Sequence, residues 1–153
     1  MTDTEDPRAL AEAIIQANEY MILATADDTG RPWSSPVWFA TADNRDFFWV
    51  SSPASRHSRN LAVRPELAFS IFDSTQVPGT GRGVYVSALA AEVPDDAIDA
   101  GLAAFSAASR RAGITKEWTR ADVEAPARHR LYRARVAELF VLSSRDERIK
   151  VPV

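Results

Sequence analysis

Three short runs of strand-forming residues near the N-terminus are joined by very short turns, and this pattern constrains the fold most. The runs cover residues 20–26 (YMILATA), 32–41 (PWSSPVWFAT) and 47–51 (FFWVS). The turn DDTG ends at Gly30, where a positive φ is expected, and the turn ADNRD is equally polar. Strands joined by such short turns pair as antiparallel neighbours, because parallel neighbours need a long crossover connection. The sequence therefore predicts an antiparallel sheet.

Further strand-like runs follow, with helical segments between some of them. Residues 6–18 precede the first strand and predict an amphipathic helix capped by Asp6. A short helix is predicted after Ser55, which is a good N-cap, and a helical segment is predicted over residues 94–126. Strands are also predicted over residues 67–72, 83–93, 130–143 and 148–153.

This order of elements predicts a mainly β fold. Strands and helices do not alternate as they do in a doubly wound parallel sheet, so a small antiparallel barrel with peripheral helices fits better. We expect about six to seven strands, an N-terminal helix, and an inserted helical segment before the last strands. The length of 153 residues suits one domain, so residues 1–153 are predicted to form a single domain.

Composition and charge exclude several classes of function. The net charge of −3 argues against a nucleic-acid binder that relies on a broad basic face. The sequence contains no cysteine and only two histidines, His57 and His129, without any HExxH motif, so no metal site is expected. The acidic N-terminus lacks the pattern of a signal peptide, and no apolar run is long enough for a membrane span. A cytoplasmic protein is therefore expected.

The segment from Ser51 to Asn60 (SSPASRHSRN) holds the densest set of anion-binding groups in the chain. A predicted strand leads here into the start of a predicted helix, where free backbone N–H groups favour an anion. The hydroxyls of Ser51 and Ser55 and the guanidinium of Arg56 would complete a cradle for one phosphate. Alternatively, Ser55 only caps the helix and the basic side chains are solvated. Both interpretations are open from the residues alone.

The aromatic and serine-bearing run over residues 33–38 (WSSPVW) is a second candidate. Two prolines, Pro32 and Pro36, predict that this strand is interrupted or lies partly at a sheet edge, where a flat heteroaromatic ligand could bind its backbone groups. Alternatively, this is an ordinary half-buried strand with Trp33, Val37 and Phe39 on one face, and the residues alone favour that interpretation. No catalytic residue is identified from either segment.

Several short motifs occur in order along most of the chain: AT, GRP and SPVWF in the early hairpin, then FWVS, SRHSRNL, RPELA, GVYVS and RLYRA. In order and spacing they resemble the FMN-binding split-barrel proteins of the pyridoxamine 5′-phosphate oxidase-like family. The resemblance covers roughly residues 15–143. It implies a split β-barrel homodimer with FMN bound at the subunit interface.

The resemblance also assigns roles to residues of the two candidate segments. Ser51 would contact the ribityl chain or the phosphate of FMN. The phosphate would be bound by Ser55, Arg56 and His57 with support from Asn60. The isoalloxazine ring would be bordered by backbone groups of Ser34, Ser35, Pro36 and Val37.

Departures from the family pattern affect the expected substrate. His57 stands where lysine is common, and Gly83 stands where a glutamine often contacts the flavin. The substrate-binding Arg-x-His motif of true pyridoxamine 5′-phosphate oxidases is replaced by Arg130-Leu131-Tyr132, and residues 32–41 contain no lysine. The resemblance therefore implies an FMN-dependent oxidoreductase that acts on another small organic molecule, with Arg130 and Tyr132 as candidate substrate-binding residues.

Two alternatives remain within the same fold. One is a reductase that uses the deazaflavin F420, whose longer phosphodiester tail would need further basic groups such as Arg59, Arg82 or Arg128. The other is a flavin- or heme-binding carrier or sensor that performs no turnover.

Overall fold

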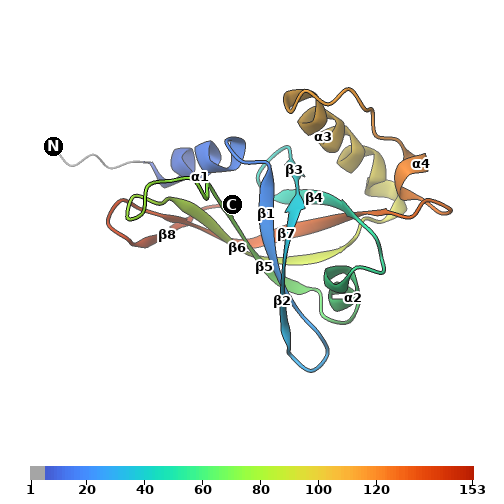
Figure 1. Ribbon diagram of the computed structural model, residues 1–153, viewed down its shortest axis with the longest axis horizontal. Helices are drawn as coiled ribbons and strands as arrows, with labels where there is room; N and C mark the ends of the chain where they lie inside the picture. The colour runs from blue at the N-terminus through green and yellow to red at the C-terminus, as the bar shows by residue number, and fades with distance from the viewer. Residues whose placement is uncertain (1–5) are drawn as a thin grey trace.

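The described residues, 6–153 in a computed structural model, begin with the predicted amphipathic helix α1 (Pro7–Gln16) (Figure 1). Residues 1–5 of the predicted single domain lie outside the described part. Asp6 caps the helix, since its carboxylate accepts a hydrogen bond from the backbone N–H of Arg8 at 3.0 Å. Ala11 and Ile15 are buried in the main hydrophobic core, so the apolar face of α1 packs on the sheet.

Eight strands form one sheet in which every pairing is antiparallel, as predicted. The order along the sheet is β2-β1-β5-β6-β7-β4-β3, and β8 pairs with β7. The strands are β1 (Tyr20–Ala26), β2 (Pro32–Trp38), β3 (Ala40–Thr41), β4 (Asp46–Ser51), β5 (Glu66–Phe72), β6 (Gly83–Glu92), β7 (Arg130–Leu142) and β8 (Arg148–Val151).

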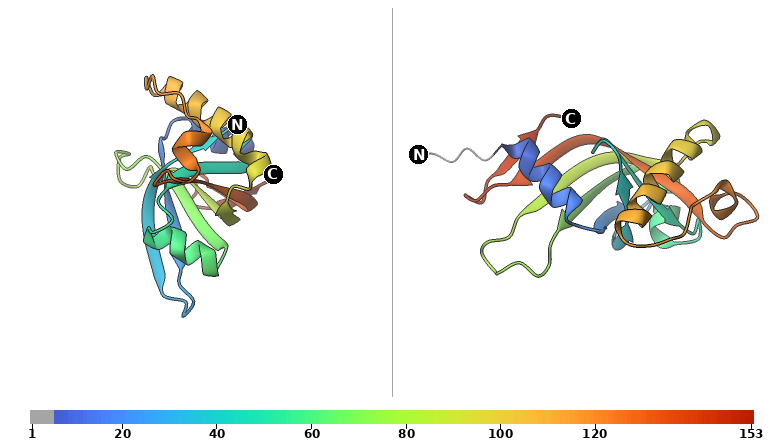
Figure 2. Two further views of the ribbon diagram at one scale, coloured as in Figure 1. Left: turned by 90° about the vertical axis from the view of Figure 1, so that its right-hand side faces the viewer. Right: turned by 90° about the horizontal axis from the view of Figure 1, so that it is seen from above.

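The two end strands of this order, β2 and β3, are separated in the chain by Phe39 alone. The sheet must therefore curl until its two ends meet, and Figure 2 shows the curled strands from two sides. β2 and β3 do not pair with each other, so the barrel is split where its ends meet. This arrangement confirms the predicted mainly β split barrel.

The strand predicted over residues 32–41 is interrupted, and the interruption falls at Phe39 rather than at a proline. The backbone N–H of Phe39 still donates to the carbonyl of Glu19 at 3.1 Å in the register of β1 and β2, and from Ala40 onward the chain pairs with β4 instead. The predicted interruption was attributed to the prolines, yet Pro36 lies within β2 and opposite Ile22. Pro36 is tolerated because β2 is an edge strand, as predicted. The division explains why the sheet has eight strands rather than six to seven.

The other helices pack on both faces of the curled sheet. Helix α2 (Arg56–Val63) follows β4 and lies beside the hairpin of β1 and β2 in both Figure 1 and Figure 2. It packs on the inner face of the curled sheet, where its Leu61 joins the main core. The predicted helical insert between β6 and β7 contains η1 (Asp95–Ala97), α3 (Ile98–Arg111) and α4 (Arg120–Val123), and α3 packs on the outer face. No helix within residues 6–153 combines the length and the apolar character needed to cross a membrane.

The long strand β7 contributes to two hydrophobic clusters. The main core, inside the curled sheet, contains Phe47, Trp49 and Phe69, and a second cluster lies between the sheet and α3. Gly101 of α3 makes this second contact close, since a Cβ atom there would lie 2.6 Å from Leu131 and 3.0 Å from Phe48. Glycine at position 101 therefore allows α3 to approach the sheet.

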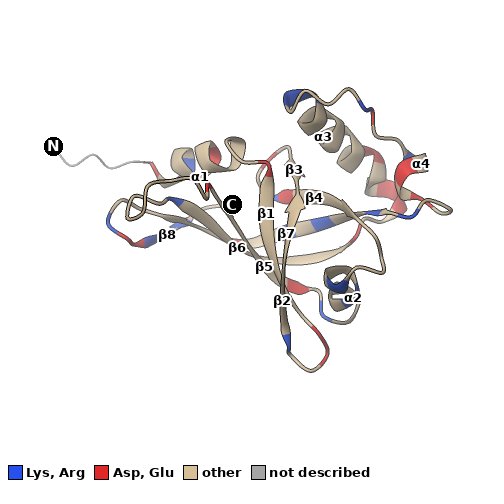
Figure 3. Ribbon diagram, in the orientation of Figure 1, with Lys and Arg blue, Asp and Glu red and all other residues tan. Residues whose placement is uncertain are grey.

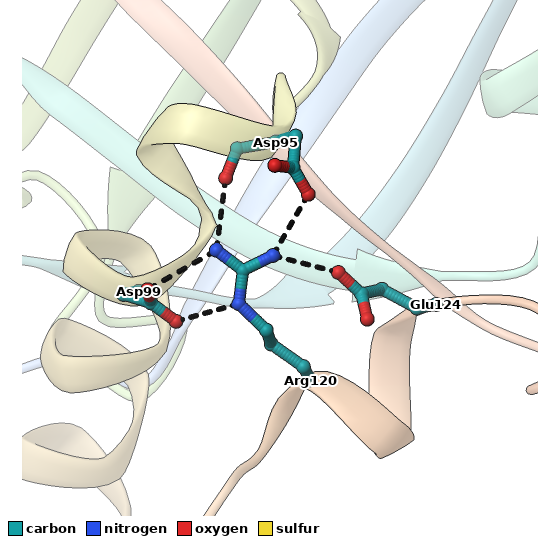
Figure 4. Close-up of polar contacts among 4 residues, drawn as sticks. All are labelled: Asp95, Asp99, Arg120 and Glu124. Carbon is teal, nitrogen blue, oxygen red and sulfur yellow. Dashed lines mark hydrogen bonds and ion pairs between the residues drawn. The ribbon is translucent and has the colours of Figure 1, made fainter.

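Arg120 joins the two ends of the helical insert (Figure 4). Its guanidinium bonds the carboxylates of Asp95, Asp99 and Glu124 at 2.7 to 3.1 Å and the carbonyl of Asp95 at 3.0 Å. Hydrogen bonds from Arg120 lower the pKa of Asp99 below its ordinary value. The cluster fastens α4 to the start of α3, and its groups are fully used by these contacts.

We expect Gly101→Ala to lower the free energy of unfolding. Overpacking against Leu131 and Phe48 costs about 1–3 kcal/mol, of which the better helix propensity of alanine returns up to about 1 kcal/mol. Urea denaturation checks this, with Ala103→Gly on the exposed side of α3 as a control that changes propensity alone. An increase in stability for Gly101→Ala would contradict the close approach of α3 to the sheet.

Candidate cofactor-binding site

A sharp corner joins β4 to α2, as the sequence predicts. β4 ends at Ser51, and Ser55 caps α2 by accepting a hydrogen bond from the backbone N–H of Ser58 at 3.3 Å. The Ser55 hydroxyl also donates to the hydroxyl oxygen of Ser58 at 2.8 Å. Two turn contacts fix the corner, because Ser52 accepts backbone N–H donors from Ser55 at 3.0 Å and from Ala54 at 3.2 Å. The other backbone N–H groups in the first turn of α2 have no carbonyl acceptor within the helix and face its N-terminal end.

The imidazole of His57 lies at the centre of a group of serine hydroxyls. Its Nε2 atom is 2.8 Å from the hydroxyl of Ser51 and 3.1 Å from that of Ser55, while its Nδ1 atom is 3.2 Å from the hydroxyl of Ser35. These four residues come from β2, β4 and the start of α2. The structure thus brings together predicted residues of both candidate segments, and we call them the histidine–serine cluster.

Burial lowers the pKa of His57 below its ordinary value. The imidazole is neutral at pH 7 in consequence, since a buried imidazolium loses hydration energy that serine hydroxyls replace only in part. No carboxylate among the described residues forms a hydrogen bond or ion pair with His57 that would favour the charged form.

Arg56 lies over an aromatic ring of the edge strand. Its guanidinium carbon is 4.3 Å from the ring centroid of Trp33, which is 40% exposed. This distance is that of a cation–π contact, which orients the guanidinium beside the start of α2. The sequence placed Trp33 in the second candidate run without predicting its contact with Arg56, although its spacing of two from Ser35 places both on one face of a strand.

Asn60 points into the protein rather than toward the histidine–serine cluster. Its side chain is buried, and its amide donates to the hydroxyl of Thr25 at 3.0 Å. Thr25 in turn lies 3.5 Å from the carbonyl of Trp33. Sequence reasoning missed Thr25, which connects α2 to the hairpin of β1 and β2. Direct contact of Asn60 with a phosphate stays a prediction.

The four predicted ring-side residues of β2 are divided between two faces. Ser35 and Val37 point toward α2 and the core, whereas Ser34 and Pro36 lie on the outer face of the sheet, opposite Ala24 and Ile22. β2 has a paired strand on one side only, so its outer row of backbone N–H and C=O groups is free of ladder hydrogen bonds.

A shallow depression of about 410 Å³ lies on the outer face and crosses five strands. It is formed by cross-strand rows of small and aromatic side chains: Ser34, Ala24, Ala68 and Ser87 in one row, and Ile22, Ser70, Tyr85 and Phe140 in the next. Ser34 therefore belongs to this depression and not to the histidine–serine cluster.

The two candidate substrate residues lie at the start of β7. Arg130 pairs with Ser51 across the sheet, and its guanidinium donates to the carbonyls of Ala127 and His129 at 2.6 and 2.7 Å. Tyr132 is only 5% exposed, stacks on Trp49 at a centroid distance of 5.6 Å, and hydrogen-bonds Ser58. Burial raises the pKa of Tyr132. Substrate contacts of both residues stay a prediction.

The charge around the site is local. Figure 3 shows basic residues on α2, whereas acidic residues gather at α4 and the start of α3. Arg56 and Arg59 provide the positive charge of α2, and Arg59 donates to the carbonyl of Ala54. No group of three or more histidine and acidic side chains in the described part of the chain is arranged to hold a metal ion. The arrangement suits an anion.

Comparison with known families agrees with this geometry. The family model described as pyridoxamine 5′-phosphate oxidase matches residues 8–143, which run from the first turn of α1 to just past the end of β7. The chain belongs to the pyridoxamine 5′-phosphate oxidase-like family. Membership confirms the resemblance seen in the sequence.

Solved structures share the fold of this family member. A heme binding protein from Mycobacterium smegmatis has a TM-score of 0.73 at 20% identity, covering 93% of this chain and 56% of that protein. A FAD-binding protein from Mesorhizobium loti has a TM-score of 0.65 at 19% identity, covering 86% and 90%. An F420 reductase has a TM-score of 0.59 at 22% identity, covering 84% and 94%. No curated protein sequence matches the chain.

We expect Thr25→Val to lower the free energy of unfolding by about 1–3 kcal/mol, because the buried amide of Asn60 loses its acceptor. Thr25→Ser is the matched control, since it keeps the hydroxyl and loses only a methyl group. Urea denaturation of both variants measures the difference. Equal losses for the two variants would show that the hydrogen bond to Asn60 contributes nothing.

Proposed function

We propose that the protein binds FMN at the corner between β4 and α2 and is a flavin-dependent oxidoreductase for a small organic molecule other than pyridoxamine phosphate. The observation that supports this proposal most directly is the histidine–serine cluster, which joins the start of α2 to the edge strand β2. A phosphate-binding group and a free strand edge are thus adjacent, as a ligand with a phosphate at one end and a flat ring at the other requires.

The residues at the corner suit a phosphate. The start of an eight-residue helix presents backbone N–H groups and the positive end of its dipole. Arg56 adds a guanidinium that Trp33 orients, and Ser51 and Ser55 add hydroxyls. Charge-assisted hydrogen bonds from such a donor set are the strong ones in proteins. Family membership supports the choice of a flavin-type cofactor.

The edge strand suits the ring. Free backbone groups of β2 can donate to and accept from the edge of a heteroaromatic ring, while Ser34 and Pro36 face outward and Ser35 holds His57. FMN, when bound, supplies the hydride and electron transfer. The protein's part is to hold the phosphate at α2 and to orient the ring along β2. No side chain is assigned as a proton donor.

The environment of Arg130 supports a substrate other than pyridoxamine phosphate. Its guanidinium is occupied by two backbone carbonyls and lies 3.6 Å from the carboxylate of Glu92. A second phosphate would have to displace these contacts. Tyr132, which stands where the family's substrate-binding histidine is expected, is buried beneath α2. A small substrate without a phosphate fits these surroundings better.

The outer face of the sheet supports a homodimer as the partner arrangement. Tyr20, Phe72 and Leu89 are 48 to 60% exposed on this face, beside the depression lined by Ala68 and its neighbours. Burying these side chains against a second copy would stabilise the dimer by about 25 cal/mol for each Å² of apolar surface removed from water. A second copy of this chain would cover the face and bring its own residues to the outward side of β2, and so complete the site.

Absorption spectra of the purified protein test the cofactor. The two visible bands of oxidised flavin are expected, with FMN released on denaturation. The absorption band of F420 would instead support the F420-dependent alternative, and a Soret band would support the heme-binding alternative. For heme, an axial histidine from this chain would have to be His57, whose ring nitrogens both contact serines, or His129. A colourless protein that binds none of these would overturn the proposal.

We expect Arg56→Ala to weaken FMN binding by about 1.5–3 kcal/mol, the value of a hydrogen bond to a charged group. Fluorescence quenching of FMN on titration measures the dissociation constant. The matched control is Arg110→Ala, which removes the same charge far from α2. The affinity of this variant for FMN should equal that of the wild type. Unchanged affinity for Arg56→Ala would contradict the phosphate position.

We expect Ala68→Arg to convert a dimer into a monomer, because the new charge would be buried at the centre of the outer face. Light scattering coupled to size-exclusion chromatography measures the mass of the particle. Ala103→Arg, on the exposed side of α3, should remain dimeric. A wild-type protein that is monomeric at micromolar concentration would contradict the dimer.

A further inference from the structure

All three hydrogen-bond partners of His57 are serine hydroxyls. Ser51 and Ser55 lie at Nε2, and Ser35 lies at Nδ1. A hydroxyl can donate a hydrogen bond or accept one, whereas a carboxylate only accepts and a backbone N–H only donates. The neutral ring needs one donor and one acceptor, and the imidazolium needs two acceptors. Rotation of the serine hydroxyls satisfies either state, so the cluster fixes the position of the ring without fixing its charge.

The charged and titratable groups around the cluster do not favour the imidazolium. Helix α2 contributes two guanidiniums: that of Arg56 lies over Trp33 of β2, and that of Arg59 donates to the carbonyl of Ala54. Strand β7 contributes Tyr132, which contacts Ser58. Arg130, which pairs with Glu92, lies at the start of the same strand. The ring is about half buried. Without a ligand, this burial favours the neutral ring.

One of the two hydroxyls at Nε2 can be replaced without loss. A single hydrogen bond satisfies that nitrogen, and two serines approach it at 2.8 and 3.1 Å. A phosphate oxygen that takes one of these places accepts a hydrogen bond, so Nε2 must then carry a proton. Ser35 can accept from Nδ1 at the same time. A phosphate bearing two negative charges would therefore stabilise the imidazolium, with Nε2 donating to the phosphate and Nδ1 donating to Ser35.

We propose that His57 binds the cofactor's phosphate as an imidazolium, so that the protein takes up one proton when a terminal phosphate monoester binds. This inference rests on the proposed function and names the ligand class of the same site. A phosphate monoester carries about −1.5 to −2 charges at pH 7 and induces the proton uptake strongly. A phosphodiester carries a single negative charge and induces it weakly. His57 thus selects for a ligand with a terminal phosphate.

The sign of the pH dependence follows from the two states of His57. Phosphate binding raises the pKa of a group that burial keeps low in the free protein. Affinity is then greatest at low pH and falls as the pH rises toward the pKa of the complex. Below about pH 6 the phosphate itself takes up a proton, which limits the increase. The fall is therefore expected from about pH 6 upward and ends where the pH passes the pKa of His57 in the complex.

Binding of FMN and of riboflavin, which lacks the phosphate, is the decisive comparison. We expect the dissociation constant of FMN to rise with pH, approaching about tenfold per pH unit, the limit for one proton. That of riboflavin should stay constant. Calorimetry of FMN binding in two buffers with different ionisation enthalpies should give uptake of up to one proton, and none for riboflavin.

Variants at position 57 provide matched controls. His57→Lys carries its charge throughout this pH range, so FMN binding should become tight and independent of pH. His57→Gln carries no charge, so binding should be weak and equally independent of pH. His129→Gln removes the other histidine and should keep the dependence of the wild type. A slope that survives in His57→Gln would overturn the inference.

Failure of the inference and failure of the proposed function are distinguishable. Tight FMN binding without any pH dependence overturns the inference and leaves the flavin site intact, whereas no binding of FMN at any pH overturns the proposed function. In that case, proton NMR of His57 with and without inorganic phosphate decides the inference. Two histidines give few signals to assign. An increase in the pKa of His57 with phosphate supports the inference, and an unchanged pKa overturns it.

Discussion

The single residue between β2 and β3 determines the rest of this architecture. Phe39 connects two strands that lie at opposite ends of the sheet, so the sheet can satisfy the chain only by curling until its ends meet. Curling carries the edge strand β2 round to the place where β4 ends and α2 begins. Trp33 and Ser35 then face Arg56 and His57, although more than twenty residues separate them in the sequence. The candidate site is a consequence of closing the barrel.

Polar contacts hold α2 to the barrel at three successive points. Arg56 lies over Trp33, His57 bonds Ser35, and Asn60 bonds Thr25. Only the last pair is buried, and it lies at the deepest point of the contact. The two outer pairs are accessible and their partners can change, while the inner pair maintains the position of the helix. A fixed helix with adjustable groups at its start is a suitable base for a site that receives an anion.

Local patterns predicted most elements, because caps, turns and alternation are written in neighbouring residues. Asp6 and Ser55 cap the helices predicted for them, and the corner after Ser51 lies where the sequence indicated. The position of the break at Phe39 was missed, because it depends on the pairing of β3 with β4, which only the fold brings about. Thr25 and the contact of Trp33 with Arg56 were missed for a similar reason, since their partners on α2 are distant in the sequence. The burial of Tyr132 depends on Trp49 and Ser58, which only the fold brings together.

The helical insert enters and leaves the barrel through two hydrogen-bonded neighbours. β6 and β7 pair up to Glu92 and Tyr132, and the backbone N–H of Val93 still bonds Leu131 before the chain departs. The hairpin is closed below the insert, and Arg120 closes the insert on itself. Evolution could therefore lengthen, shorten or replace this segment without disturbing the barrel. Members of one family could in this way keep a common barrel while diverging in the helices that stand beside it.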